Sequence, residues 1–596
     1  MTAPGLECAT LQVPVSREDP SLGTVPLAVQ RLAPSAPQAG TILLLAGGPG
    51  QAALPPFEAL LAPLARLPAL RSYGLVSFDQ RGTGQSGALG CPETIEIRST
   101  LASYLAACGA ALGTSRADYT SQSSVDDLEA LRQALGGSPM SLFAVSYGAK
   151  VAAMYAREHP EGVARVVLDS PSPLAGADPI DSQRQRALRR VLDEGICGSG
   201  ACRSFARDPY ADLVRLVGAV RAHPISARIF DSRGRGETVS VGETAAARII
   251  GLMDLSPRMA QLVPGAITAA VRGDAAPLAR LAGAQPVLIS TGAVNGVSSA
   301  AELALEGEGP SGAAGGEAAS AQEPASSLFS LELLFATSCV ERPLPWPPES
   351  PLAARAGELR SWISQLPAGI TYPFTLHGVV SRSLIELCKP WPPTPAAPPA
   401  PNGISSVPTL ILSGDEDLRT PYEQDLTVAS GYGDAQILRI PNTGHSTVGS
   451  DRSGCAQRAM IAFLTGHPAP ASCPNPPASQ VPPPPSSLSD VHPSGSRPTL
   501  AARGAAAVAL TVQEIVGQPS LSGGGLRGGY WRLRGARLTF NRVIDIAGVS
   551  LSGSIQLDKA TGDLTIRGRV NGRLAIRGTT MAGHLNGANV HAHVVT

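Results

Sequence analysis

Short apolar runs alternate with stretches of helical periodicity along the first third of the chain. Residues 41–45, 73–78 and 140–145 are almost continuously apolar, which is the pattern of strands buried on both faces of a parallel sheet. Residues 57–67 and 125–135 show the helical spacing of apolar positions instead. Strands that alternate with helices in this way predict an α/β fold with a mostly parallel sheet.

The alternation stops after residue 173 and resumes with another buried strand at residues 407–414. The intervening pattern is mainly helical. We therefore expect an inserted domain at 174–404, within a core that is formed by residues 1–173 and 405–474.

Two stretches of low complexity interrupt these domains. Residues 306–317, inside the insertion, consist largely of Gly, Glu and Ala and predict a mobile loop. Residues 475–499 are rich in Pro and Ser, which indicates a stiff, extended linker.

Beyond the linker, residues 500–596 form a third region with few acidic residues. Apolar and polar positions alternate strictly, for example at 549–557 and 573–577, and glycines separate the alternating runs. This pattern predicts a small antiparallel β domain. His591 and His593 share one face of its last strand, where we expect a solvated edge, because two histidines alone seldom hold a metal.

Composition excludes several classes of partner. The 596 residues suffice for more than one domain, and 47 basic residues balance 47 acidic ones. Nucleic-acid and membrane-surface binding usually require a basic excess, so we expect neither. No apolar run is long enough to span a bilayer, so we expect no transmembrane segment.

The nine cysteines fall into four local pairs and a single Cys8. No pair has the spacing of a zinc or redox site, so we expect no metal. The pairs indicate disulfides of an exported protein; buried thiols of a cytosolic enzyme are the alternative. The first residues lack the basic and apolar regions of a signal peptide, so we expect a leader to have been removed and a secreted, periplasmic or cell-surface location. The pairs are Cys91–Cys108, Cys197–Cys202, Cys339–Cys388 and Cys455–Cys473.

Ser146 directly follows the buried strand at 140–145 and precedes a helical stretch. A serine at such a strand–turn–helix junction can serve as a nucleophile, provided that small residues flank it where the two backbones nearly touch. Gly148 satisfies this condition, and Ala144 stands where glycine is more usual. We therefore expect Ser146 at the apex of a nucleophile elbow.

A serine nucleophile needs a base that is oriented by an acid. Asp417 follows the strand at 407–414, and His445 follows the next strand, so both should reach the same edge of the sheet as Ser146. Asp169, after the strand that follows the elbow, is the alternative acid. The neighbours Asp415 and Glu416 are expected to be solvated.

The glycine-rich loop after the first buried strand predicts an oxyanion hole. We expect the backbone N–H groups of Gly48 and Tyr147 to bind the oxyanion. Thr420 is expected to brace the Asp417 loop. Asp79 and Arg81 are expected to pin the neighbouring turn by hydrogen bonds.

Five motifs carry a resemblance to a known family: Gly47-Gly-Pro-Gly50, Asp79-Gln-Arg-Gly-Thr-Gly-Gln-Ser86, Val145-Ser-Tyr-Gly148, Gly414-Asp-Glu-Asp417 with Thr420-Pro421, and Gly444-His445. Through them, residues 7–474 resemble the proline iminopeptidase and tripeptidyl aminopeptidase family of α/β-hydrolases, and the later cysteine segments resemble its secreted tripeptidyl-aminopeptidase-like branch. The resemblance implies an α/β-hydrolase fold with a mainly helical cap at 174–404, Ser146 as nucleophile, Asp417 as acid and His445 as base. Ala144 and the cap depart from the family pattern, so substrate length and preference do not transfer.

The activity that follows is that of a serine hydrolase acting on peptide substrates as an aminopeptidase, without a cofactor. Such an enzyme binds a cationic amine with carboxylates, and Glu341 is our candidate. One alternative is an esterase with the same triad. Another is a binding protein that attaches to a cell surface through residues 500–596.

Overall fold

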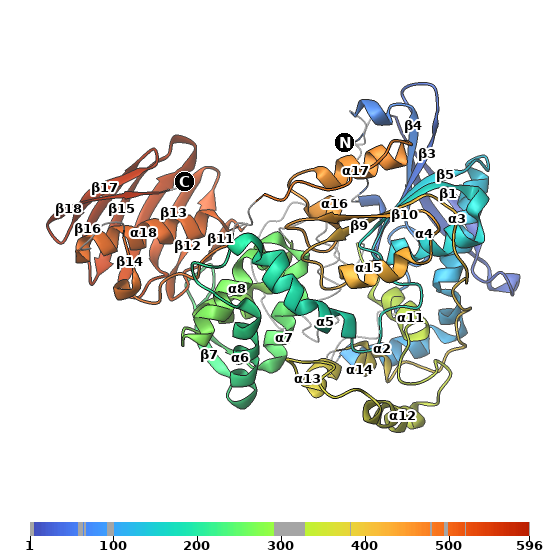
Figure 1. Cartoon of the computed structure of the whole chain (residues 1–596), viewed down its shortest axis with the longest axis horizontal. Helices are drawn as coiled ribbons and strands as arrows, with labels where there is room; N and C mark the ends of the chain where they lie inside the picture. Colours follow the sequence, from blue (N-terminus) through green and yellow to red (C-terminus); the bar gives the residue numbers. More distant parts are fainter. Residues whose placement is uncertain are drawn as a thin grey trace. The chain divides into compact units, whose positions relative to one another are not determined.

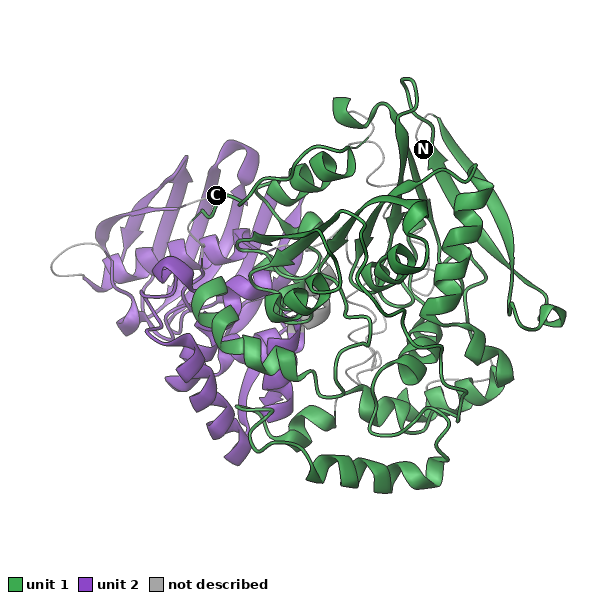
Figure 2. Ribbon diagram, turned by 45° about the vertical axis from the view of Figure 1, so that its right-hand side comes forward, with its two compact units in different colours: residues 1–196, 253–257, 292–478 green, residues 197–252, 258–291, 479–596 purple. Residues whose placement is uncertain are grey.

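The structure is a computed structural model that consists of two compact units (Figure 2). Unit 1 comprises residues 1–196, 253–257 and 292–478, and unit 2 comprises 197–252, 258–291 and 479–596. The expected loop at 306–317 and most of the expected helix at 57–67 lie outside the described residues. The structure describes residues 5–55, 57, 64, 67–91, 101–290, 328–381, 383–476, 480–493, 499–518 and 520–594, without the side chains of 284–290.

Unit 1 is built on an eight-stranded sheet of order β1-β2-β4-β3-β5-β6-β9-β10 (Figure 1). β2 runs antiparallel to both of its neighbours, β1 and β4, and all the strands from β4 to β10 in this order are parallel. The expected parallel α/β fold is confirmed. The strands are β1 (Leu6–Pro14), β2 (Thr24–Leu32), β3 (Gly40–Leu45), β4 (Tyr73–Phe78), β5 (Met140–Val145), β6 (Val163–Asp169), β9 (Thr409–Gly414) and β10 (Ala435–Ile440).

Helices cover both faces of this sheet, because the central strands are apolar on both sides. On one face, α3 (Ser121–Ala134) and α4 (Tyr147–Glu158) enclose a cluster that contains Leu43, Leu142 and Val166. On the other face, α17 (Cys455–Leu464) packs on a cluster that contains Ile42 and Phe143. Two short helices lie in the loops after β9 and β10: α15 (Tyr422–Ala429) and α16 (Thr447–Ser450).

Five further helices of unit 1 surround a separate apolar cluster, in which Phe335, Ile385 and Trp391 are fully buried. Two disulfides, Cys91–Cys108 and Cys339–Cys388, lie among these helices. The helices are α2 (Leu101–Ala111), α11 (Leu331–Glu341), α12 (Leu352–Ser364), α13 (Leu376–Val380) and α14 (Leu384–Cys388). The helix α5 (Ser182–Arg190) packs against α15 instead.

Unit 2 contains a second eight-stranded sheet, antiparallel throughout, with its strands in sequence order (Figure 1). The expected C-terminal β domain is confirmed in this sheet. Its strands are β11 (Ser522–Gly524), β12 (Gly528–Arg534), β13 (Arg537–Ile544), β14 (Val549–Gln556), β15 (Thr561–Gly568), β16 (Gly572–Arg577), β17 (Thr580–Leu585) and β18 (Ala588–His593).

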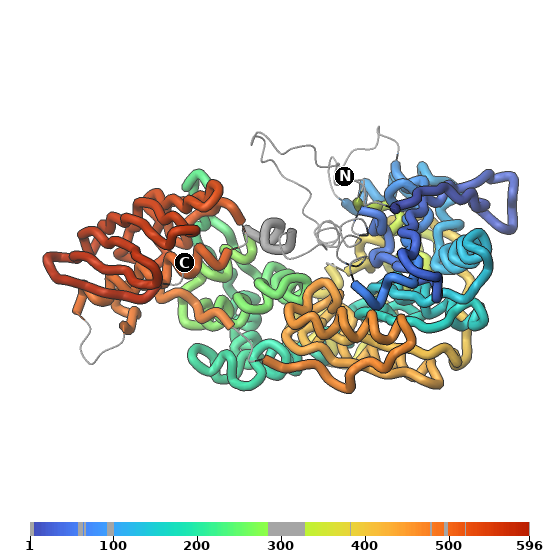
Figure 3. The backbone as a smooth tube through the Cα atoms, turned by 90° about the horizontal axis from the view of Figure 1, so that it is seen from above, coloured from blue at the N-terminus to red at the C-terminus, as the bar shows by residue number. Residues whose placement is uncertain are grey.

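A helix that we did not expect, α18 (Leu500–Val516), packs on one face of this sheet (Figure 1, Figure 3). Thr499 caps its N-terminus by accepting a hydrogen bond from the N–H of Ala502. Its buried face includes the small residues Ala501, Gly504 and Ala505, and a Cβ at Gly504 would lie 2.8 Å from a methyl group of Val570. Small residues therefore allow the helix and the sheet to approach closely.

Part of the expected insertion belongs to unit 2, together with the C-terminal region. Partly buried ion pairs join the two segments: Arg280 pairs with Glu514 of α18, and Arg527 pairs with Asp274. Leu488, in the expected linker, is buried in the core beneath α18. The inserted elements of unit 2 are α6 (Pro209–Ala222), the hairpin β7 (Ile225–Phe230) and β8 (Gly236–Val241), α7 (Glu243–Leu252), α8 (Pro257–Val271) and α9 (Ala276–Ser290).

Candidate active site

Ser146 lies at the sharp turn between β5 and α4, with φ 54° and ψ −117°. Such a positive φ is strained for a serine and occurs where the surrounding structure imposes it. A Cβ at Gly148 would lie 2.3 Å from the carbonyl oxygen of Ala46, so only glycine fits there. Ala144 is fully buried, and its methyl group is accommodated. The local geometry is that of a nucleophile elbow.

The glycine-rich loop after β3 runs beside Ser146. A Cβ at Gly47 would lie 3.1 Å from the Cβ of Ser146, which shows how closely the loop approaches the serine. Gly48 has φ 114°, a conformation that favours glycine. Tyr147 is the first residue of α4, so its N–H has no partner within the helix. Both N–H groups predicted to bind an oxyanion thus belong to segments next to the serine.

His445 and Asp417 form a buried pair. The Nδ1 of His445 lies 2.9 Å from Oδ2 of Asp417, and their side chains are 4% and 0% exposed. The backbone N–H groups of Arg419 and Thr420 donate to Oδ1 of Asp417 at 2.8 and 2.9 Å. Burial by itself raises the pKa of Asp417, but attraction to His445 and these hydrogen bonds outweigh burial and lower it. Asp417 is therefore held as a carboxylate that orients the imidazole.

Thr420 bridges the members of this pair. Its hydroxyl donates to Oδ2 of Asp417 at 2.8 Å and lies 3.1 Å from Nδ1 of His445. The side chain is buried, so water does not compete for these contacts. Thr420 therefore holds both the Asp417 loop and the His445 ring in place.

Asp254, a residue that the sequence analysis did not identify, clamps the Asp417 and His445 loops together. Its fully buried carboxylate accepts hydrogen bonds from the N–H groups of Leu418 at 3.1 Å and Arg419 at 2.9 Å. It also pairs with the guanidinium of Arg419 at 3.1 Å. Its backbone carbonyl accepts the N–H of His445 at 2.9 Å. No local motif marks this aspartate, because the contact depends on residues 253–257 returning to unit 1.

Asp169, the alternative acid, makes a different set of contacts. Its carboxylate accepts the N–H groups of Thr447 at 2.8 Å and Val448 at 2.9 Å, at the start of α16. Burial raises the pKa of Asp169, and these N–H groups offset part of that rise. Among the described residues, the carboxylate hydrogen-bonded to the His445 ring is that of Asp417. Asp169 instead anchors the segment that follows His445.

Glu341, our candidate for binding a substrate amine, is engaged by groups of the protein. Its carboxylate forms an ion pair with Lys150 at 2.7 Å and accepts hydrogen bonds from the N–H and hydroxyl of Ser121. Only 8% of its side chain is exposed. A substrate amine would have to displace Lys150, so these contacts favour a role in joining α11 to α3 and α4.

The two acidic neighbours of Asp417 differ in their surroundings. Asp415 is partly exposed and forms an ion pair with Arg439 at 2.7 Å. The expectation that Glu416 is solvated is wrong: its side chain is buried, and burial raises its pKa to about 8. A Cβ at Gly195 would lie 3.7 Å from its Cγ, so the segment around Gly195 covers Glu416.

Asp79 and Arg81 hold the turn after β4, away from the reacting groups. Asp79 accepts hydrogen bonds from the N–H groups of Ala53 and Leu54 at 2.7 and 3.0 Å. Arg81 forms a buried ion pair with Asp127 at 2.7 Å. Their contacts join this turn to residues 53–54 and to α3.

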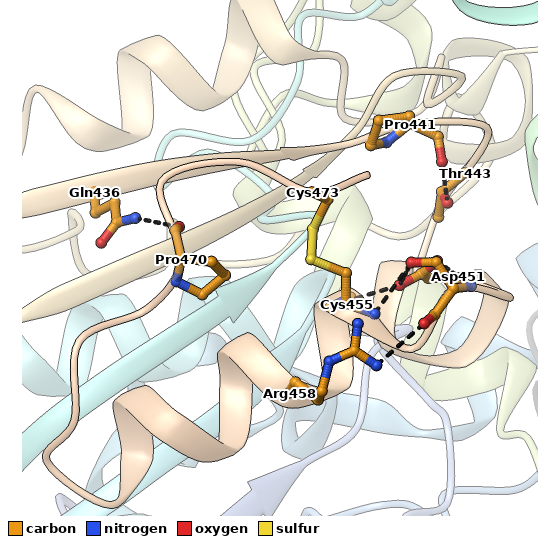
Figure 4. Close-up of a disulfide and its surroundings, with 10 residues drawn as sticks. Gln436, Pro441, Thr443, Asp451, Cys455, Arg458, Pro470 and Cys473 are labelled. Carbon is orange, nitrogen blue, oxygen red and sulfur yellow. Dashed lines mark hydrogen bonds between the residues drawn. A yellow bond between two sulfur atoms is a disulfide. The ribbon is translucent and has the colours of Figure 1, made fainter. Parts of the chain in front are cut away.

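All four cysteine pairs are bonded, and Cys8 on β1 is free and exposed. The bond Cys455–Cys473 joins the start of α17 to the segment that follows this helix (Figure 4). Glu332 lies close to the sulfurs of Cys91 and Cys108, but these sulfurs are bonded to each other and offer no thiolate to a metal. None of the described helices has the length and apolarity needed to cross a membrane.

Comparisons with known proteins agree with this fold. A family model described as "alpha/beta hydrolase fold" matches residues 40–194, which include Ser146. A second, described as "TAP-like protein", matches residues 372–476, which include Asp417 and His445. The two matches lie on either side of residues 195–371.

Three relatives illustrate the likeness. The serine protease Hip1 of Mycobacterium tuberculosis H37Rv is 24% identical over 507 residues, 78% of this chain and 86% of Hip1. The tripeptidyl aminopeptidase of Streptomyces coelicolor is 26% identical over 189 residues, 28% of this chain and 35% of that protein. Carboxylesterase B of M. tuberculosis CDC 1551 is 36% identical over 102 residues, 16% of this chain and 20% of that protein. The chain therefore has the α/β-hydrolase fold, and its residues 372–476 are similar to the TAP-like proteins.

Proposed function

We propose that this serine hydrolase removes residues from the N-termini of peptides, with Ser146, His445 and Asp417 as its catalytic triad. One observation carries the proposal. A serine with positive φ lies at the elbow after β5, and a buried His–Asp pair lies in the loops after β9 and β10 of the same sheet. Parallel strands bring these three loops to one edge, which is where such folds place their reactive groups.

The proposed reaction proceeds through an acyl-enzyme. His445 accepts the hydroxyl proton of Ser146 on Nε2 while Oγ attacks the peptide carbonyl, and Asp417 stabilises the resulting imidazolium through Nδ1. The N–H groups of Gly48 and Tyr147 bind the oxyanion. His445 then gives its proton to the leaving amine, and water, activated by the same imidazole, releases the acyl group. This chemistry requires no cofactor.

Peptides are favoured as substrates by the relatives that the chain resembles. The match to the serine protease Hip1 spans most of both proteins, and the tripeptidyl-aminopeptidase-like family model covers the segment that holds Asp417 and His445. The likeness to carboxylesterase B covers a much shorter part. We also propose that the enzyme works outside the cytoplasm, because four disulfides persist in oxidising compartments.

A panel of fluorogenic substrates tests the proposal, with wild type and Ser146→Ala assayed side by side. The panel holds free-amine aminoacyl and tripeptidyl amides, their N-acetylated counterparts and short acyl esters. Cleavage of the free-amine amides alone, abolished by Ser146→Ala, is the expected result. Cleavage of esters without amides would make the protein an esterase. Cleavage of both amide sets at equal rates would exclude recognition of the amine.

A further inference from the structure

The C-terminal sheet carries a positive charge that the rest of the chain balances. Residues 520–594 contain nine arginines and one lysine but only three aspartates and no glutamate, whereas the whole chain has a net charge of zero. Among the described residues, only one of these arginines, Arg527, forms a salt bridge. Unpaired like charges on one rigid sheet repel one another, and an anionic ligand would relieve this repulsion.

Side chains on β14 to β17 divide sharply between the two faces of the sheet. The apolar residues Ile555, Leu564, Leu574 and Met581 are buried in the core beneath α18. Their neighbours in sequence point the other way, because side chains alternate along a strand. Across the strands the register pairs Ser554 with Asp563, Asp563 with Ala575, and Ala575 with Ala582, so polar and small residues form a continuous row on the outward face.

Two adjoining hollows open on this outward face. One, of about 600 Å³, lies over β15 to β17 and is lined by Thr565, Arg573 and His584, among others. The second, of about 390 Å³, lies over β13 to β16 and is lined by Arg537, Arg577 and Gln556, among others. Asp563 lines both, so the two hollows are neighbours on this face. Their volumes fall in the range of ligand sites.

The lining matches a ligand with both hydroxyl and acidic groups. Arg573 and Arg577 are exposed and lie four residues apart on β16, which spaces their backbones by about 13 Å. Between them lie hydroxyl groups and the carboxylate of Asp563, which are partners for sugar hydroxyls. Apart from the imidazole of His584, the residues that line the hollows include no aromatic ring on which a nucleic-acid base could stack. The central carboxylate also disfavours a densely charged polyphosphate.

We propose that the outward face of β13 to β17 binds an acidic polysaccharide, a sugar chain with spaced carboxylate groups. Arg573 and Arg577 each bind one acidic group of the sugar chain. Asp563 accepts hydrogen bonds from the sugar hydroxyls that lie between these two acidic groups. This site is separate from the hydrolytic triad and would hold the enzyme on an anionic glycan while it cleaves peptides.

The test is binding of polygalacturonate to the full-length protein by titration calorimetry at two salt concentrations. Single-stranded DNA, anionic phospholipid vesicles and neutral dextran are the comparison probes. The double variant Arg573→Gln/Arg577→Gln removes the proposed contacts. The control, Arg534→Gln/Arg569→Gln, removes two exposed arginines of the same sheet region that do not line either hollow. Hydrolysis of a peptide amide is measured throughout and should be unchanged.

We expect wild type and the control variant to bind polygalacturonate with equal affinity. The Arg573/Arg577 variant should bind it at least about tenfold more weakly, because two charge-assisted hydrogen bonds are lost. Asp563→Ala should also weaken binding; tighter binding by this variant would mean that only net charge matters and would overturn the proposal. Equal weakening by the control, absence of polygalacturonate binding, or tighter binding of DNA or vesicles would each overturn it as well.

Discussion

Replacing Asp254 with alanine should slow the reaction although Asp254 touches no reacting atom in the proposed mechanism. The substitution removes the acceptor of two backbone N–H groups and of the Arg419 guanidinium. Breaking a buried ion pair on one side costs about 3–5 kcal/mol, so we expect the free energy of unfolding to fall by that amount. The Asp417 loop would then lose its attachment to residues 253–257.

The fall in kcat should be smaller in Asp254→Ala than in a variant that lacks Asp417, the acid of the proposed triad. Asp417 keeps its own hydrogen bonds from Arg419 and Thr420, so the carboxylate is displaced rather than freed. A misplacement of about 1 Å can cost about 100-fold in rate, whereas losing a triad aspartate costs about 10⁴-fold. We therefore expect kcat to fall about 10- to 100-fold in Asp254→Ala, with little change in KM.

The assay is steady-state hydrolysis of the best substrate of the panel, with urea unfolding measured on the same preparations. Asp212→Asn is the matched control, because Asp212 is also a buried carboxylate, paired with Arg215 and Thr268 of unit 2, and takes no part in the Asp417 loop. The control should lose stability and keep its kcat. An Asp254→Ala enzyme with wild-type kcat, measured while folded, would refute the reasoning.

Three further predictions concern residues around the core. Gly148→Ala should lose about 3 kcal/mol of stability or fail to fold, because its Cβ would lie 2.3 Å from a backbone oxygen; a wild-type urea midpoint would contradict this. The pKa of Glu416 is raised to about 8, so between pH 5 and 8 the folded state keeps a proton that the unfolded state releases. As the pH rises through this range, wild type should therefore lose about 3 kcal/mol of stability relative to Glu416→Gln. If the free energies of unfolding of the two proteins depend on pH in the same way, the pKa shift of Glu416 is excluded. Arg280→Met alone should destabilise unit 2 by about 3 kcal/mol, because it leaves the carboxylate of Glu514 without its cationic partner. The second change, Glu514→Leu, should restore part of that loss. A double variant less stable than the single one would argue against this ion pair.

The parts of the site that could be predicted are those encoded by neighbouring residues. Ser146 is recognisable because strand, turn and helix follow one another around it. Asp417 and His445 are recognisable because each directly follows an apolar strand, and parallel strands end at a common edge. Local pattern and strand order therefore sufficed to place these three residues in loops that follow strands of one sheet.

What could not be predicted depends on distant segments meeting. Asp254 lies in an insertion, and nothing in residues 253–257 indicates that they return to the Asp417 loop. Glu416 follows a strand in a polar stretch, yet the segment near Gly195 buries it. The helix α18 escaped prediction because half of its buried residues are Ala or Gly, whose small side chains give a weak apolar signal.

The most direct test of the central claim is covalent labelling by a fluorophosphonate, which reacts with an activated serine. The labelled protein is digested, and the modified peptide is located by mass spectrometry, with His445→Ala and Ser146→Ala as comparisons. We predict one adduct per chain, on Ser146, absent from Ser146→Ala and at least about 100-fold slower to form in His445→Ala, since the base contributes that much to proton removal. An adduct on another serine, or labelling of Ser146 that does not depend on His445, would contradict the proposed triad.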